Sequence, residues 1–147
     1  MKNYKIKIQE EDNFCLCSVL QAIFKKHEIY FSQIEIAKNL TPSEKGFFAD
    51  DFRIKNFLNN NKFNYEFYFY DKTPFNEPDM LLREMDKHHG IIGIKNHVYL
   101  LNEFQDPILQ IINPKDNKII KNNIYLIRRE MQEEDGFFGL LEYICFS

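Results

Sequence analysis

Four residues of this 147-residue chain have the types that acyl transfer by a thiol requires: Gln9, Cys15, His97 and Asn113. Such a reaction needs a thiolate nucleophile, a base that takes the thiol proton, a group that orients the base and a donor to the developing oxyanion. Each residue alone has a plain structural interpretation, since a free cysteine is most often a small buried hydrophobe. Only the combination indicates chemistry.

The place of Cys15 relative to the expected first helix bears on its reactivity. Asp12 or Asn13 can cap this helix, whose apolar face follows the i, i+3, i+4, i+7, i+8 spacing through Leu16, Val19, Leu20, Ile23 and Phe24. Unpaired N–H groups and the positive end of the helix dipole favour a thiolate in the first turn. Gln9 lies six positions before Cys15. Its side-chain amide and the Cys15 backbone N–H can therefore both donate to an oxyanion.

The chain is predicted to be helical up to about residue 61. Three helices are expected, from 12 or 13 to 27 or 28, from 32 to 40, and from 50 or 51 to 58 with fraying at 59–61. The second begins with a capping box formed by Ser32 and Glu35, and Thr41-Pro42 stops it.

After residue 62 the pattern changes to strands. We predict strands at 63–70, 90–94, 97–102, 108–113 and 137–146. A helix with Pro78 in its first turn and Leu81, Met85 and His88 on one face separates the first two, while 123–132 fits either a helix or a strand. The fold class expected is α+β, with N-terminal helices packed on a C-terminal antiparallel sheet.

The hairpin formed by 97–102 and 108–113 predicts a contact between His97 and Asn113. If the connection is symmetric about Gln105, each of the two residues lies eight positions from the centre. Directly opposite residues have Cβ atoms about 5 Å apart on one face of the sheet. An Asn carbonyl that accepts from one imidazole nitrogen leaves the other free to take a thiol proton. A one-residue bulge would break this register.

Composition excludes several classes of protein. The net charge is -3, 28% of residues are charged and 44% are hydrophobic, values typical of one folded domain, here residues 1–147. They give no electrostatic reason to expect nucleic acid or an anionic membrane as a partner. The apolar stretches are too short to span a bilayer, so we expect a cytoplasmic protein.

The remaining titratable residues predict no metal and no cofactor. Three cysteines without paired spacing fit neither a disulfide framework nor a zinc site, which favours a reducing compartment. Cys17 and Cys145 are expected in the core. His88 and His89 are adjacent and would diverge by about 100° on a helix. Four acidic residues form a solvated loop that at best rims a cleft for a basic substrate: Glu130, Glu133, Glu134 and Asp135.

Four segments together resemble the C39-like branch of the papain-like cysteine peptidases. These are Gln9 with Cys15, then Ser32-Gln33-Ile34-Glu35-Ile36-Ala37, His97-Val98-Tyr99-Leu100-Leu101 and Ile111-Ile112-Asn113-Pro114. The family includes the bacterial double-glycine peptidase domains, which remove leaders from secreted peptides and are often fused to an ABC exporter. The resemblance implies a papain-like fold, with Cys15 as nucleophile, His97 as base and acid, Asn113 as orienting residue and Gln9 as oxyanion donor.

Three positions depart from the family pattern. Leu16 stands directly after the nucleophile, where Gly is usual, and Cys17 stands where Pro or Ala is frequent. Asn113 stands where Asp is more frequent. The expected activity is cleavage of a peptide bond after small residues such as Gly, with a peptide or protein substrate and an exporter acting in trans. Two alternatives stay open. One is an acyl transferase or deamidase that uses the same triad, and the other is a non-catalytic domain that binds a peptide, which Leu16 favours most.

Overall fold

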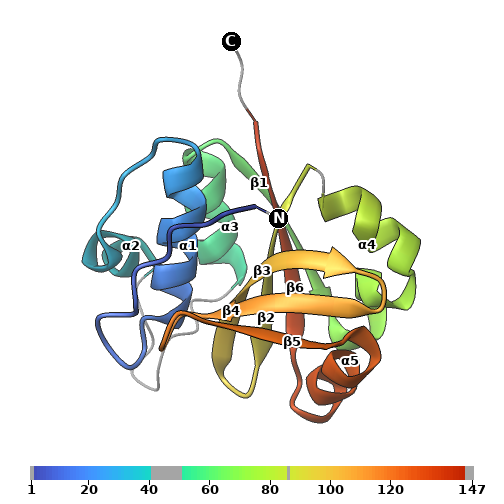
Figure 1. Cartoon of the computed structure of the whole chain (residues 1–147). Coiled ribbons are helices and arrows are strands. Elements are labelled where there is room, and N and C mark those ends of the chain that lie inside the picture. Colours follow the sequence, from blue (N-terminus) through green and yellow to red (C-terminus); the bar gives the residue numbers. More distant parts are fainter. Residues whose placement is uncertain (1, 41–50, 86, 145–147) are drawn as a thin grey trace.

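The computed structural model describes residues 2–40, 51–85 and 87–144, and it confirms the α+β class. One antiparallel sheet has the strand order β1-β6-β2-β3-β4-β5. Helices α1, α2 and α3 cover one face of the sheet, and α4 and α5 lie on the other (Figure 1). The elements are α1 Cys15–Lys26, α2 Gln33–Leu40, α3 Asp51–Asn60, β1 Phe63–Phe69, α4 Pro78–Met85, β2 His89–Ile94, β3 His97–Gln105, β4 Ile108–Asn113, β5 Lys118–Asn123, α5 Ile124–Glu133 and β6 Phe137–Tyr143.

The two faces of the sheet bury separate apolar clusters. Along β3, Val98 and Leu100 pack under α1, whereas Leu101 and Phe104 pack under α4 and α5. Up to Leu101 this alternation is the two-residue period of a strand that is covered on both faces. The register shift between Leu101 and Glu103 then places Phe104 on the same face as Leu101. At the centre of the first cluster, Phe24 of α1 meets three other phenylalanine rings edge to face: Phe31, Phe57 and Phe63. Burial of each such ring stabilises the fold by roughly 1.5–3 kcal/mol.

The predicted capping box of the second helix is confirmed. Ser32 Oγ accepts from the Glu35 N–H at 3.1 Å, and a Glu35 carboxylate oxygen accepts from the Ser32 N–H at 3.1 Å. The third helix also forms as predicted, as α3. The Thr41-Pro42 stop and a start at Asp50 lie outside the described residues.

The predicted start of the first helix is wrong. Helix α1 begins at Cys15 after Phe14, and no side chain caps it. The Phe14 N–H donates to the Glu11 carbonyl at 3.0 Å, so a turn that contains Asp12 and Asn13 precedes the helix. The N-cap position is therefore Phe14, and both Asp12 and Asn13 lie before it.

Other element boundaries differ from the prediction. Helix α4 ends at Met85, before His88, and the ambiguous stretch 123–132 is helix α5, where the Asn123 side chain accepts from the Tyr125 N–H at 2.8 Å. Strand β5 was not predicted, because its residues are mostly exposed and show no alternation. Strand β6 ends at Tyr143, and the predicted end at 146 lies outside the described residues.

The predicted register between β3 and β4 is wrong. Leu100 pairs with Ile112 and Gln105 with Ile108. Strand β4 has the predicted bounds, but β3 is longer than predicted, so only Asp106 and Pro107 connect the two strands. The register also shifts between Leu101 and Glu103. Continued beyond Leu100, this pairing places Tyr99, rather than His97, opposite Asn113.

Candidate active site

Cys15 is the first residue of α1, and its side chain is buried at 2% exposure. Burial raises the pKa of its thiol, and the backbone N–H groups of Val98, Leu16 and Cys15 itself act on the sulphur in the opposite direction. The N–H groups at the helix start thus lower the thiol pKa as predicted, but burial is the larger effect and the net shift is upward. Cys15 is a thiol at neutral pH unless a nearby base accepts its proton.

His97 follows the tight hairpin turn between β2 and β3. Lys95 and Asn96 connect β2 to β3 with φ values of 52° and 60°, the left-handed pair that a two-residue turn requires. His97 is the first residue after this turn and pairs with Ile94. The Val98 backbone N–H lowers the pKa of the Cys15 thiol, so this sulphur lies near the peptide group that joins His97 to Val98.

The imidazole of His97 bonds the side chain of Asn113. Its Nε2 lies 2.7 Å from Asn113 Oδ1, which also accepts from the Lys115 N–H at 3.0 Å. A carbonyl oxygen can only accept, so Nε2 carries the hydrogen and Nδ1 keeps its lone pair. The predicted contact therefore exists through a different register. Asn113 lies diagonally across from His97, at a distance that these side chains can bridge.

Tyr99 was not predicted as part of this site. Its ring packs edge to face on His97, with 4.7 Å between ring centroids. Burial raises the pKa of its phenol, and Glu130 and Cys15 add to this effect. Its position in the sequence could have indicated this contact, since a residue two places after His97 on a strand lies on the same face of the sheet.

Gln9 approaches the site through its main chain. Its N–H donates to the carbonyl of Pro114, the residue after Asn113, at 2.9 Å. Its side-chain Nε2 donates to the carbonyls of Glu11 and Asp12 at 2.9 and 3.0 Å, which uses both amide hydrogens. Among the described residues, no group bonds the buried Oε1. An oxyanion can therefore take a hydrogen bond from Gln9 only in exchange for one of these two bonds.

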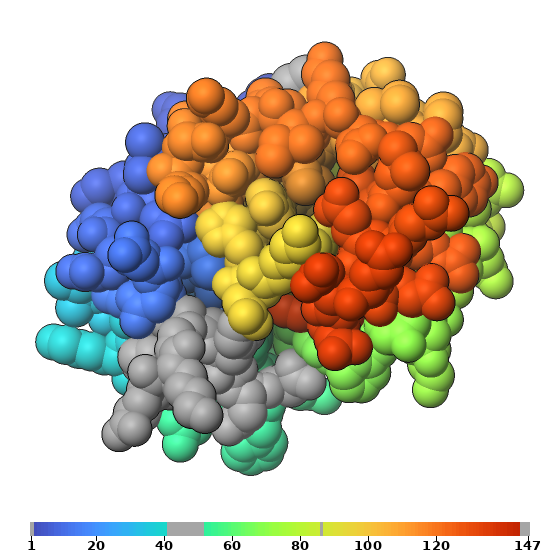
Figure 2. Space-filling view, turned by 90° about the horizontal axis from the view of Figure 1, so that it is seen from below, coloured from blue at the N-terminus to red at the C-terminus, as the bar shows by residue number. Residues whose placement is uncertain are grey.

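A cavity of about 240 Å³ opens beside His97, between the β2–β3 turn and the loop from α5 to β6. Two of the four acidic residues that were predicted to rim a cleft, Glu134 and Asp135, line it together with Lys95. In Figure 2 the yellow β2–β3 turn lies between the blue N-terminal region, the orange β4–β5 region and orange-red α5. By residue number, Gln9 and Cys15 belong to the blue region, His97 directly follows the yellow turn, and Asn113 belongs to the orange region.

The adjacent histidines, His88 and His89, do diverge. His88 faces Glu84 and Glu142, at 3.1 and 3.0 Å, whereas His89 is buried against other partners. Within residues 2–40, 51–85 and 87–144, no group of three or more His, Cys, Asp or Glu side chains could hold a metal ion. In the same ranges, no helix is both long and apolar enough to cross a bilayer.

A cysteine helix packed on an antiparallel sheet that carries a histidine defines the papain-like cysteine peptidase fold. No family model matches this chain, and no curated protein does. The solved structures with this fold include a double glycine motif protease from an AMS/PCAT transporter in complex with the leader peptide, at 16% identity and a TM-score of 0.73, with 97% of this chain and 94% of that chain covered.

Two further solved structures show the same fold. The peptidase domain of Streptococcus ComA, a bifunctional ABC transporter involved in quorum sensing, is 18% identical with a TM-score of 0.73 over 97% of this chain and all of that one (100%). UfSP from C. elegans is 14% identical with a TM-score of 0.66, and the match covers 98% of this chain but 34% of that chain. The chain thus has the fold of C39 peptidase domains.

Proposed function

We propose that this protein is a cysteine peptidase in which Cys15 is the nucleophile, His97 the base and acid, Asn113 the orienting residue and Gln9 an oxyanion donor. One observation carries the proposal. The Val98 backbone N–H lowers the pKa of the Cys15 thiol, and the preceding residue, His97, bonds Asn113 through Nε2 at 2.7 Å. The Nδ1 lone pair is thus left for the thiol, on a fold that solved peptidase domains share.

The reaction follows from these positions. His97 Nδ1 takes the thiol proton, and the Cys15 sulphur attacks the carbonyl carbon of a peptide bond. The carbonyl oxygen becomes an oxyanion, which the Cys15 N–H and Gln9 Nε2 stabilise by donating to it. The amide C–N bond then breaks as Nδ1–H gives its proton to the leaving amine. Water adds to the resulting thioester with Nδ1 as base, and the acid product leaves as Cys15 regains its proton.

Two features indicate that the site must change when substrate binds. Cys15 is 2% exposed, and both amide hydrogens of Gln9 are bonded to its own loop. A substrate carbonyl reaches the sulphur after groups over it move, and exchange of one Gln9 bond supplies the oxyanion donor.

The substrate that we propose is a peptide or protein segment with a small residue such as Gly before the scissile bond. The support is likeness to protein structures described as a double glycine motif protease and an ABC transporter peptidase domain. An exporter would act in trans, in the cytoplasm of a bacterium. Glu134 and Asp135 line the cavity beside His97, so a cationic substrate residue would be attracted there.

A non-catalytic domain that binds a peptide is the second candidate function. The burial of Cys15 and the internal bonds of Gln9 favour it, since neither group is presented to a ligand. The two candidates differ in thiol reactivity and in hydrolysis. An acyl transferase or deamidase would share the reactive thiol and differ only in what accepts the acyl group.

The test combines thiol labelling with hydrolysis. Iodoacetamide at pH 6, followed by mass spectrometry, should modify one thiol, and a fluorogenic peptide ending in Gly-Gly before the dye should be cleaved. Both activities should be lost in Cys15→Ala and reduced in His97→Ala. Cys17→Ala is the matched control and should keep both activities. Burial raises the pKa of the Cys17 thiol to about 12, so this thiol should not react with iodoacetamide in the wild-type protein. Equally slow labelling of all three cysteines, without hydrolysis, would leave only the binding function.

A further inference from the structure

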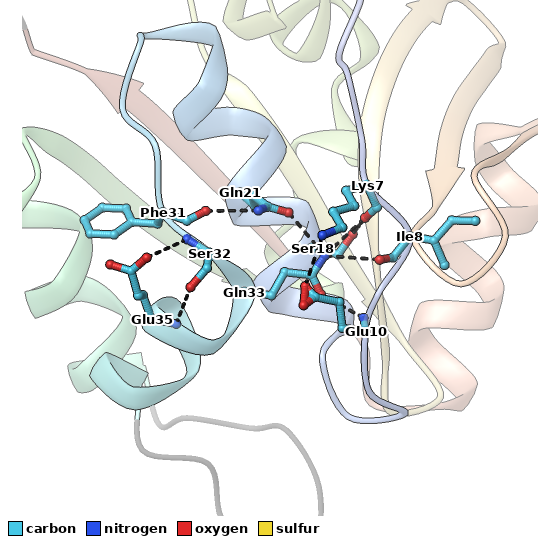
Figure 3. Close-up of polar contacts among 9 residues, drawn as sticks. All are labelled: Lys7, Ile8, Glu10, Ser18, Gln21, Phe31, Ser32, Gln33 and Glu35. Carbon is cyan, nitrogen blue, oxygen red and sulfur yellow. Dashed lines mark hydrogen bonds and ion pairs between the residues drawn. The ribbon is translucent and has the colours of Figure 1, made fainter.

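Main-chain residues 7–10, which carry Gln9, are held by side chains rather than by a strand ladder. This stretch belongs to no helix or strand. Buried backbone groups outside regular structure need other partners. Figure 3 shows that these partners include polar side chains of α1 and of α2, which point toward the N-terminal segment.

Gln33, the first residue of α2, makes most of these contacts although it is 0% exposed. Its Oε1 accepts from the Glu10 N–H at 2.8 Å. Its Nε2 lies 3.1 Å from the Ile8 carbonyl and 3.3 Å from that of Lys7. One amide therefore bonds the main chain on both sides of Gln9.

A chain of hydrogen bonds fixes the direction in which the Gln33 amide points. Gln21 Nε2 donates to the Phe31 carbonyl at 3.0 Å, so Gln21 presents its oxygen to Gln33. Gln33 Nε2 donates to that oxygen at 3.2 Å, which leaves Gln33 Oε1 as the acceptor for Glu10. A flipped Gln33 amide would bring two oxygens together at Gln21 and two N–H groups together at Glu10. The buried network therefore has one satisfied arrangement.

A second buried side chain acts on the same stretch. The Ser18 hydroxyl, on α1, donates to the Lys7 carbonyl at 2.6 Å, and the residue is 0% exposed. On the opposite side, the Gln9 N–H is bonded to Pro114 at 2.9 Å. Gln9 is thus set between the helix that carries Cys15 and the strand end that carries Asn113.

We propose that Gln33 is a positioning residue for catalysis, which sets Gln9 at the distance from Cys15 that an oxyanion donor needs. This inference rests on the proposed function. Without the Gln33 amide, the Ile8 carbonyl and the Glu10 N–H lose the partner that holds them against α2, so we expect residues 7–10 to shift. A shift of about 1 Å in a positioned group lowers a rate by roughly 100-fold.

The test uses Gln33→Met, which keeps the length and much of the volume of the side chain. For the Gly-Gly fluorogenic peptide, we expect kcat/KM to fall roughly 10- to 100-fold. A peptide aldehyde ending in Gly-glycinal, which forms a tetrahedral adduct with the thiol, should bind more weakly by a similar factor. Alkylation of Cys15 by iodoacetamide should change by less than about twofold, because this reaction forms no oxyanion.

A double-mutant cycle separates positioning from general destabilisation. If Gln33 acts through Gln9, the loss caused by Gln33→Met should shrink to less than about twofold in a Gln9→Ala background. Leu40→Ala is the matched control, because this buried residue of the same helix makes no hydrogen bond to 7–10 with its side chain. It should lower the free energy of unfolding and leave kcat unchanged.

Several outcomes overturn the inference. Wild-type kcat/KM in Gln33→Met would do so. So would a loss of kcat/KM from Gln33→Met that is as large in the Gln9→Ala background as in the wild type, or a loss of the same size in Leu40→Ala. If Gln33→Met fails to fold, Ser18→Ala serves instead, because it removes the bond to Lys7. We expect a smaller loss of kcat/KM in this variant, and little loss in the Gln9→Ala background. Losses of kcat/KM from Ser18→Ala and Gln9→Ala that simply add would count against the inference. Wild-type protein that neither labels nor cleaves would refute the proposed function itself, a result visible before any Gln33 variant is made.

Discussion

Replacement of Asn113 by Ala tests the arrangement of the base most directly. Asn113 Oδ1 accepts the Nε2–H of His97 at 2.7 Å. In Asn113→Ala the imidazole keeps its edge-to-face contact with Tyr99 but loses the acceptor that fixes its tautomer and orientation. The imidazolium formed when Cys15 transfers its proton loses that acceptor too.

The size of the effect follows from the charge on that intermediate. A hydrogen bond to a charged group contributes about 1.5–3 kcal/mol. Since about 1.4 kcal/mol corresponds to a tenfold change in rate, kcat/KM for the Gly-Gly peptide should fall roughly 10- to 150-fold. The rate of Cys15 alkylation at pH 6 should fall as well, because it depends on the same thiolate and imidazolium.

Two further variants make the measurement specific. In Asn113→Asp a carboxylate oxygen can accept from both His97 and the Lys115 N–H, so activity should stay within about threefold of wild type. Asp116→Ala is the matched control, because it removes the acceptor of the Lys118 N–H in the same β4–β5 turn without touching His97. Its activity should be unchanged. Wild-type rates in Asn113→Ala, or an equal loss in Asp116→Ala, would refute the assignment of Asn113 as the orienting residue.

Three measurements of stability check other parts of the structure. Ser32→Ala should lower the free energy of unfolding by about 1 kcal/mol in urea titrations, because it removes half of the capping box with Glu35. Leu16→Ala should cost about 2–5 kcal/mol by the same assay, since Leu16 is 1% exposed in the core. Burial, with smaller contributions from nearby cations, lowers the pKa of His89 to about 3, so the unfolded chain binds a proton below pH 6.5 that the folded protein excludes. Between pH 7.5 and pH 5 the free energy of unfolding should therefore fall by roughly 2 kcal/mol, and most of this fall should be absent in His89→Leu.

Local patterns predicted most of the elements. The Ser32 and Glu35 capping box and the alternation that starts at Phe63 depend on side chains within one turn or one strand, and both elements form as predicted. The start of α1 was predicted wrongly because Asp12 and Asn13 are good caps in isolation, yet a turn to Glu11 uses this part of the chain. Strand β5 was missed because an exposed edge strand has no buried face to produce a period.

The contact between His97 and Asn113 was predicted through an incorrect register. The sequence alone did not show that β3 continues to Gln105 or that its pairing shifts after Leu101. The contact tolerates this error because a histidine and an asparagine are long enough to bridge a diagonal pair of positions. The electrostatics of Cys15 could not be predicted, since its burial depends on how α1 packs against β3, which no local pattern contains.

Asn113 and Pro114 link His97, the proposed base, to Gln9, the proposed oxyanion donor. Asn113 holds His97 through its side chain, while the next carbonyl, of Pro114, accepts the Gln9 N–H. Gln33 bonds the main chain on both sides of Gln9 from the opposite direction. The proposed oxyanion donor, Gln9, is therefore placed by contacts to the strand end that carries Asn113 and to a helix on the Cys15 side of the sheet.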